Sequence, residues 1–262
     1  MHKILLILQK ELIEIRQQPI LLMSMILPPL IFTVLPVLVF MLMRSGVSGS
    51  MKSVSNIAFS YPALARMSPI EAMQTVTGMQ FSVLYVLLPG LLTSIIASYS
   101  IIGEKTSRTL EPLLATPIRT WELLVGKSLA ALVPGVGITW LSGILFIISL
   151  AFLSASPQVF ATIISPGWLV LFLIWSPLLA LISIAVMVAI SARVNDTRSA
   201  QQASIWLVVP FLSIFFGQLA GVQVLGVIFT LVVAVVLAVL AVAAFWLTVR
   251  IFQRETILTR WK

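Results

Sequence analysis

The residues that most clearly suggest a chemical function are Gly126, Lys127 and Ser128, which end the polar stretch GEKTSRTLEPLLATPIRTWELLVGKS at 103–128. Gly-Lys-Ser closes the phosphate-binding pattern Gly-x-x-x-x-Gly-Lys-Ser/Thr. That pattern needs a glycine at position 121, because the backbone must curl to point its N–H groups at phosphate. Residue 121 is a tryptophan, and the residues after it form a good helix with no strand before it. We therefore expect that this chain does not itself bind ATP.

The composition indicates a protein that uses lipid as its solvent. Of 262 residues, 60% are hydrophobic and only 9% are charged, whereas a soluble domain has about 25% charged residues. The net charge of +8 fits basic cytoplasmic loops better than a nucleic-acid partner. There is no cysteine and a single histidine, His2, so neither thiolate chemistry nor a metal site is predicted.

Long uncharged runs predict the membrane spans, since about 20 apolar residues cross a bilayer core of roughly 30 Å. A final run at 203–249 would extend about 70 Å as one helix, so we expect it to turn at 217–223. The fold class is an all-α membrane protein with six transmembrane helices in a single transmembrane domain, 1–262. The predicted spans lie near 20–43, 81–102, 128–153, 167–191, 204–217 and 224–249.

The N-terminal segment predicts an amphipathic helix that lies in the membrane interface before the first span. One face carries Leu5, Leu8, Leu12 and Ile15 at three-to-four-residue spacing,. A cytoplasmic extension of the first span is the alternative. The segment has acidic residues and no small-residue cleavage site, so it does not resemble a signal peptide.

The distribution of Lys and Arg predicts that both termini are cytoplasmic. With that orientation, 13 of the 16 basic residues lie on inner segments, and only Arg44, Lys52 and Arg66 lie on outer loops,. The first outer loop, 44–80, is expected to carry a short helix near 69–75.

The first inner loop predicts two short helices with a break between them. Residues 110–115 form the first helix, with Pro112 early, and Thr116-Pro117 read as the N-cap and first position of the second,. The second helix would continue into the third span, with Lys127 at the water boundary. Leu110, Leu113 and Leu114 give the first helix apolar groups to bury, either in lipid headgroups or in a groove of a partner protein.

This loop resembles the first cytoplasmic loop of the ABC-2 permease family, the membrane subunits of ATP-binding-cassette exporters. The family pattern runs acidic-x-x-x-Gly-Thr-Leu-Glu-x-Leu-Leu-x-Thr-Pro and then a helix ending in Gly-Lys. Arg108 stands where many members have glycine. Segments 9–29, 191–204 and 252–262 are similar to the family's N-terminal Lys-Glu segment, second cytoplasmic loop and basic tail. The matching loop residues are Thr109, Leu110, Glu111, Leu113, Leu114, Thr116, Pro117, Gly126 and Lys127.

The resemblance implies half of a membrane channel, completed by a second copy or a related chain, above two separate ABC ATPase subunits. ATP and Mg would be bound by those subunits, so the chain itself is expected to be no enzyme and to need no cofactor. The helix at 110–115 would be the coupling helix, with Leu113 and Leu114 as apolar contacts, Arg108 and Glu111 as charged contacts, and Thr116-Pro117 as a joint. In the second loop, Arg193, Asp196 and Arg198 would form a smaller contact; simple positive-inside anchoring is equally expected. A prokaryotic plasma membrane is the expected location.

The predicted spans contain no charged residue, and this argues against a proton-coupled carrier. It favours a substrate that tolerates an apolar route, such as a lipid, an amphipathic drug or a hydrophobic peptide. Polar side chains that would line the path equally fit helix packing. They are Ser94, Ser98 and Tyr99 in the second span and Ser204, Ser213 and Gln218 in the fifth.

Three other classes of function compete with a permease driven by a separate ATPase. A secondary carrier or channel would usually need intramembrane charge or inverted repeats, and an intramembrane enzyme would need acids or histidines within the spans. A non-transporting anchor or regulator of an ATPase would keep the same coupling loop. Movement of a substrate on ATP hydrolysis separates the permease from this last class.

Overall fold

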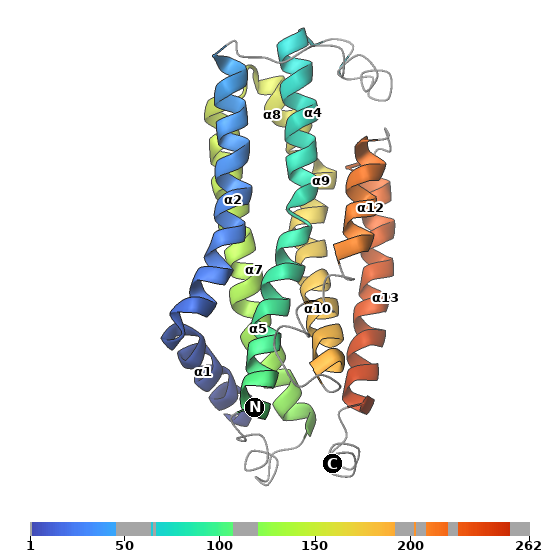
Figure 1. The fold of residues 1–262 in the computed structure, drawn as a ribbon. Coiled ribbons are helices and arrows are strands. Elements are labelled where there is room, and N and C mark those ends of the chain that lie inside the picture. The colour runs from blue at the N-terminus through green and yellow to red at the C-terminus, as the bar shows by residue number, and fades with distance from the viewer. Residues whose placement is uncertain are drawn as a thin grey trace.

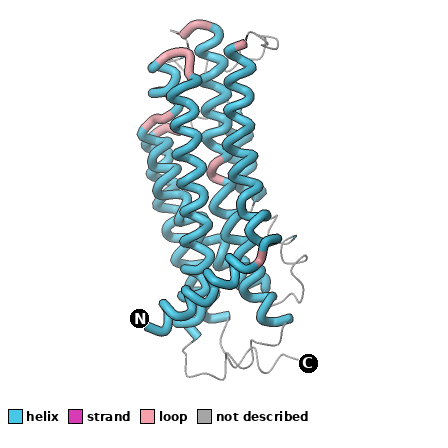
Figure 2. Tube along the Cα trace, turned by 90° about the vertical axis from the view of Figure 1, so that its left-hand side faces the viewer, coloured by secondary structure: helices cyan, strands magenta, loops and turns pink. Residues whose placement is uncertain are grey.

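The computed structural model describes residues 2–45, 64, 67–106, 120–191, 202, 208–219 and 225–251. These residues are helical or lie in short connections, and no strand occurs among them. The helices run nearly parallel along one long axis (Figures 1 and 2). Five apolar helices are long enough to cross a membrane, namely Pro19–Arg44, Pro69–Ser100, Trp121–Leu153, Pro166–Ser191 and Val227–Thr248.

The first two helices meet at a single residue. Helix α1 (His2–Gln17) is followed by the single residue Gln18, which is the N-cap of α2 (Pro19–Arg44). Helix α2 begins with a proline, whose missing N–H is harmless in the first turn. Helix α1 slants away from the axis of α2 (Figure 1). The predicted N-terminal helix is therefore observed, whereas its location in a membrane interface stays a prediction.

The second apolar helix begins earlier than the sequence predicted, at Pro69 instead of near 81. Ser68 accepts a hydrogen bond from the Glu71 N–H and the Glu71 carboxylate accepts one from the Ser68 N–H, so a capping box starts α4 (Pro69–Leu84),. The helix expected near 69–75 is thus the first part of this long element. A break at Tyr85 and Val86 separates it from α5 (Leu87–Thr106). Pro89 explains the break, since it has no N–H to donate to the Tyr85 carbonyl four residues earlier.

The third and fourth apolar helices are joined by a short outer segment. Helix α7 (Thr120–Leu153) is continuous despite Pro134, and α8 (Pro157–Ile163) follows it. The fourth element comprises α9 (Pro166–Val170), the π-helical turn η2 (Leu171–Trp175) and α10 (Ser176–Ser191). A π-turn inside an α-helix widens one turn and frequently occurs at functional positions.

The last part of the chain contains α12 (Val208–Leu219) and α13 (Val227–Ile251). The 12 residues of α12 extend about 18 Å, less than a bilayer core. Helices α10 and α13 both descend toward the end of the bundle that holds the N-terminus (Figure 1), so the chain must return between them. Helix α12 runs in that return direction, but residues 203–207 lie outside the described residues, and the sixth span stays a prediction.

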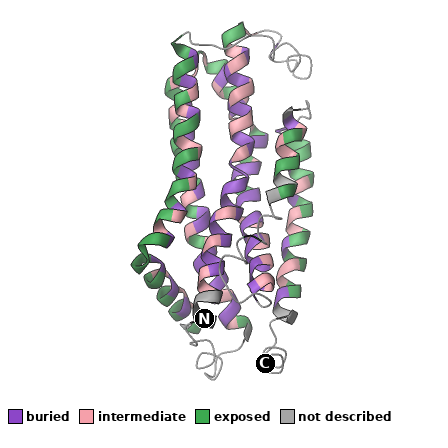
Figure 3. Ribbon diagram, in the orientation of Figure 1, coloured by how far each residue is buried: buried purple, intermediate pink, exposed green. Residues whose placement is uncertain are grey.

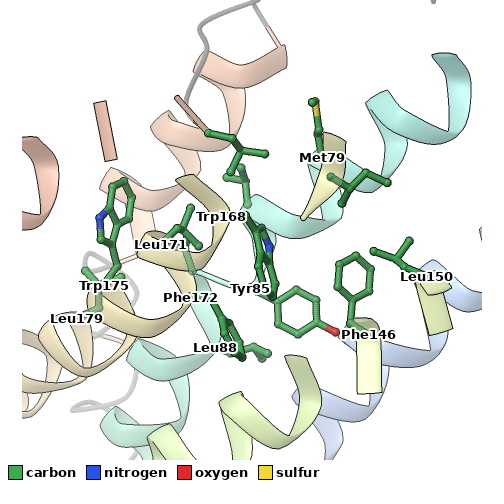
Figure 4. Close-up of a cluster of buried hydrophobic side chains, with 14 of the residues drawn as sticks. Met79, Tyr85, Leu88, Phe146, Leu150, Trp168, Leu171, Phe172, Trp175 and Leu179 are labelled. Carbon is green, nitrogen blue, oxygen red and sulfur yellow. The ribbon is translucent and has the colours of Figure 1, made fainter. Parts of the chain in front are cut away.

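The second apolar helix forms the centre of the bundle. In its most apolar stretch 78% of residues are buried, against 22% in α2 and 17% in α13, and Figure 3 shows the same contrast. Its core neighbours are large aromatic side chains (Figure 4). The Trp168 and Phe172 rings stack at 4.8 Å, and Tyr85 packs on Phe146 at 5.1 Å. The outward apolar faces of α2 and α13 are suited to lipid or to another membrane protein.

Candidate functional site

The end of the bundle that holds the N-terminus also holds the two helix ends that flank the first predicted cytoplasmic loop. The backbone of α5 is described to Thr106 and that of α7 from Thr120. Both ends lie near the start of α1 (Figure 1). The predicted ATPase contacts Arg108, Leu110, Glu111, Leu113, Leu114, Thr116 and Pro117 lie outside the described residues, as do Arg193, Asp196 and Arg198 of the second loop.

A buried ionic cluster joins three helices at this end. Lys127 Nζ on α7 lies 2.9 Å from Glu11 Oε1 on α1, and the two side chains are only 6% and 3% exposed. Lys127 Nζ also donates to the Ser100 carbonyl of α5 at 3.0 Å and contacts Ser100 Oγ at 2.8 Å. Ser100 Oγ donates to Glu11 Oε2 at 2.6 Å. We call Glu11, Ser100 and Lys127 the three-helix cluster.

The cluster satisfies the conditions under which buried charges are tolerated. Burial raises the pKa of Glu11, but the Lys127 charge and the hydrogen bonds from Ser100 and Lys127 outweigh it, so the pKa lies below its ordinary value. A buried ion pair with full hydrogen bonding adds little to the free energy of unfolding compared with apolar residues of the same volume. Removing one partner of the pair lowers that free energy by about 3–5 kcal/mol. The cluster is thus sensitive to loss of either charge.

Close backbone packing accompanies the ionic contact. A Cβ added at Gly126 would lie 2.8 Å from Ile7 Cγ2 and 2.9 Å from Ile7 Cβ, so only glycine lets α1 approach α7 this closely. The Gly126-Lys127 pair therefore has a structural use that is unrelated to phosphate. Gly126 leaves room for Ile7 of α1, and Lys127 neutralises the Glu11 carboxylate of the same helix.

Lys127, predicted to lie at the water boundary, has its side chain buried against Glu11, and its depth relative to a membrane stays a prediction. The buried side of α1 also differs from the predicted leucine face. Ile7, Glu11 and Ile15 are buried, whereas Leu5 is 55% exposed. Sequence reasoning missed Glu11 because a carboxylate on a helix is normally assigned to solvent. Its spacing of four from both Ile7 and Ile15 is the signal that was available.

The two serines among the predicted pathway residues of α5 are buried among helices. Ser94 Oγ donates to the Leu91 carbonyl and Ser98 Oγ to the Ile95 carbonyl, at 2.8 and 2.9 Å. Such bonds to the preceding turn satisfy a hydroxyl within its own helix. Tyr99 is half-buried. The geometry is compatible with the helix-packing alternative for both serines.

The predicted pathway residues of α12 differ from each other. Ser213 is exposed, whereas Gln218 is 1% exposed, and neither its Nε2 nor its Oε1 has a hydrogen-bond partner among the described residues. Buried amides are normally paired, so Gln218 is the more unusual of the two. Ser204 lies outside the described residues.

A backbone carbonyl of α2 that lacks its helical donor because of a proline accepts a hydrogen bond from a side chain of another segment. Pro36 has no N–H for the Phe32 carbonyl, and Tyr85 Oη donates to that carbonyl at 3.2 Å. Thr33 Oγ1 nearby donates to the Pro29 carbonyl at 2.8 Å and lies 2.7 Å from Ser142 Oγ. The bend-prone part of α2 is thereby tied to α7 and to the break between α4 and α5.

The π-turn in the fourth element contains a similar contact. In π register the Phe172 carbonyl would pair with residue 177, which is a proline. Trp140 Nε1 on α7 donates to the Phe172 carbonyl at 3.2 Å and to Ser176 Oγ at 2.9 Å, and Ser176 Oγ donates to the same carbonyl. A Cβ at Gly143 would lie 2.2 Å from the Phe172 ring, so α7 fits closely around this turn.

The described part of the chain is an all-helical bundle with five helices able to cross a membrane, and this architecture defines a multi-pass integral membrane protein,. Within the described residues, no group of His, Cys, Asp or Glu could hold a metal ion. Comparison with curated proteins gives no match.

The chain matches, over residues 5–228, a family described as ABC-2 family transporter protein. It therefore belongs to the ABC-2 family and is a transporter permease, the membrane component that works with an ABC ATPase. The resemblance drawn from the loop at 103–127 is confirmed at the level of the family.

Proposed function

We propose that this chain is the permease half of an exporter that moves a lipid, an amphipathic drug or a hydrophobic peptide across the plasma membrane. Two copies, or this chain with a related one, form the complete channel. Two ATPase subunits bind ATP and Mg and dock from the cytoplasm. The family match over 5–228 carries the proposal. It covers the described helices in full, apart from the first residues of α1 and all but the start of α13.

The first cytoplasmic loop is the proposed ATPase contact. Leu110, Leu113 and Leu114 form the apolar side of a coupling helix, and Arg108 and Glu111 contact charged groups of the ATPase. A rigid link needs a firm base at both ends of the loop. The bonds from Lys127 on α7 to Ser100 on α5 support such a base, because they tie the two flanking helices together.

The absence of Asp, Glu, Lys, Arg and His from the predicted spans supports an apolar substrate. Ser94, Ser98, Tyr99, Ser213 and Gln218 are retained as proposed lining residues. Among them, Gln218 is the first to test, since its buried amide has no hydrogen-bond partner in the part of the chain that the structure describes. The loop residues Arg193, Asp196 and Arg198 are proposed as a second, smaller ATPase contact.

The test is affinity purification of the tagged chain from its native membrane, with identification of co-purifying proteins and an ATPase assay. Leu113→Asp with Leu114→Asp should leave the permease in the membrane and release the ATPase. Ile70→Asp is the matched control, because Ile70 is an exposed apolar residue (51%) on α4, near the opposite end of the bundle. Full retention of the ATPase by the double variant would refute the coupling-helix assignment.

Transport itself is tested by ATP-dependent movement of a fluorescent lipid and a fluorescent hydrophobic peptide in proteoliposomes that contain the purified complex. ATP hydrolysis without movement of either compound would favour the anchor or regulator class. A chain that purifies without any ATPase and remains stable would favour the carrier or channel class.

A further inference from the structure

The three-helix cluster is placed where it can transmit movement of the first cytoplasmic loop. Ser100 lies on α5, just before the loop, and Lys127 lies on α7, just after it. Glu11 contributes the third side chain from α1, a helix that is distant in sequence from both. The Glu11–Lys127 contact is buried and the contacts of Ser100 are short and partly buried, so α1 is fixed to both flanking helices.

Apolar packing around the three-helix cluster also fixes α1 to α5 and α7. Ile7 meets the backbone at Gly126, one residue before Lys127, so the ionic and apolar contacts to α7 coincide. Ile15 belongs to a core cluster that also contains Ile96 of α5 and Leu124 of α7. Helix α1 therefore does not rest on the bundle through charge alone.

Helix α1 is also connected directly to the first span. Gln18 is the single residue between α1 and α2, so rotation of α1 is passed to α2 over one residue. A movement of the loop would consequently reach α2 through α1, in addition to α5 and α7.

We propose that Glu11, Ser100 and Lys127 form a clamp that makes α1 move as one rigid body with α5 and α7, so that the docking loop drives α2 as well. The proposal rests on the proposed function, because it takes the loop to be the ATPase contact. It assigns Glu11, Ser100 and Lys127 as positioning residues. They transmit movement and contact neither substrate nor nucleotide.

Three charge-neutralising variants test the clamp in the complex purified with its ATPase, namely Glu11→Gln, Lys127→Gln and the double variant. Glu14→Gln is the matched control, since it makes the same change three residues along the same helix, at a side chain that is 50% exposed. We expect the double variant to retain its ATPase but to lose at least fivefold in the ATP-dependent transport of a fluorescent lipid. The control should stay within about twofold of the unmodified complex.

A disulfide between α1 and α7 separates a clamp from a folding role. The chain has no cysteine, so Ile7→Cys with Gly126→Cys introduces the sole pair. The 2.9 Å between Ile7 Cβ and a built Gly126 Cβ is shorter than the ~3.8 Å of a disulfide, and a shift of α1 by about 1 Å permits the bond. If α1 and α7 move together, oxidation should change transport by less than about twofold in the otherwise unmodified chain.

The same disulfide should restore transport to the Glu11→Gln/Lys127→Gln variant, and reduction should remove the gain. A charge variant with normal transport, or a loss that oxidation does not restore, would overturn the clamp, as would inhibition of the otherwise unmodified chain by the disulfide. If the double charge variant does not accumulate in the membrane, Ser100→Ala replaces it, because it removes hydrogen bonds and no charge.

These outcomes are distinct from failure of the proposed function. An unmodified chain that retains no ATPase refutes the proposed function before any variant is compared. A chain that retains its ATPase and transports the lipid equally well with and without the cluster refutes the clamp alone.

Discussion

The hydrogen bond from Tyr85 to the Phe32 carbonyl allows a double-mutant test of the packing between α2 and the second apolar helix. Tyr85→Phe keeps the aromatic ring, which packs on Phe146 at 5.1 Å and on Phe32 at 6.4 Å, and removes only the hydroxyl that donates at 3.2 Å. The carbonyl loses its partner because Pro36 cannot supply an N–H.

The expected loss is about 1 kcal/mol in the free energy of unfolding. An unpaired buried acceptor costs about 1–3 kcal/mol, but hydrogen bonds between membrane helices average nearer 0.6 kcal/mol. A loss of 1 kcal/mol lowers the folded-to-unfolded ratio about fivefold. Tyr99→Phe, the same change at a half-buried tyrosine of α5, is the control and should lose less.

Pro36→Ala provides the decisive comparison. The alanine restores an N–H that can reach the Phe32 carbonyl in the ordinary helical way. In the presence of Pro36→Ala, the effect of Tyr85→Phe should therefore fall below about 0.3 kcal/mol, the usual limit of additivity. Any effect of Pro36→Ala on its own is subtracted by the cycle.

The assay is equilibrium unfolding in mixed micelles with increasing dodecyl sulfate, followed by tryptophan fluorescence. All four members of the cycle are measured under one set of conditions. Equal effects of Tyr85→Phe with and without Pro36→Ala would show that the hydroxyl does not replace the missing helical donor, and the reasoning would be refuted.

Three further predictions concern packing, orientation and pH. Gly143→Ala should lose about 1–3 kcal/mol in the same assay, as overpacking does, because its Cβ would meet the Phe172 ring. Gly137→Ala should be neutral, because its Cβ would meet no atom of another described element within 4 Å, and equal losses would contradict the described packing. Cysteine introduced at Ser156 should react with an impermeant maleimide in intact cells, and cysteine at Ser199 only after permeabilisation; the reverse pattern would overturn the predicted orientation. Because the folded pKa of Glu11 is lowered, its contribution to α1 docking is complete above the unfolded value of about 4.3 and is lost as pH falls through the lower folded value. A fluorophore on Ile13→Cys should report undocking of α1 in that acid range, and Glu11→Gln should abolish the pH dependence; an unchanged profile would count against the role of Glu11.

Much of the helical arrangement could be predicted from the apolar runs, because each of four runs is long enough to cross a bilayer by itself. The start of the second helix was missed because its first turns contain Gln74, Thr75 and Gln80, which read as an outer loop. In the structure Gln74 accepts a hydrogen bond from the Ala155 N–H, and Thr75 donates to the Glu71 carbonyl. Polar residues that are satisfied by a neighbour or by their own helix cannot be recognised from local composition.

The ionic cluster was missed for a different reason. Glu11 and Lys127 are far apart in the sequence, so neither reveals that it is paired, and each charge alone suggests solvent. The family resemblance did draw attention to Gly126 and Lys127, but as part of a motif and not as a contact of α1. The predicted ATPase contacts at 108–117 lie outside the described residues, and they stay predictions that rest on sequence.

Some backbone carbonyls lack a helical donor because of a proline and are instead satisfied by side chains of other helices. This affects the order in which the chain can be assembled during synthesis. Helix α2 is made first, yet the group that closes its Phe32 carbonyl, Tyr85, belongs to the next apolar helix, and Ser142, which lies beside Thr33, belongs to the one after that. On first insertion α2 therefore holds a backbone acceptor that lipid cannot satisfy. The order is reversed at the π-turn, where Trp140 is in place before Phe172 is made. The hydrogen bonds of α2 are thus completed only after the second and third apolar helices have been inserted, whereas the fourth helix finds its partner already in the membrane.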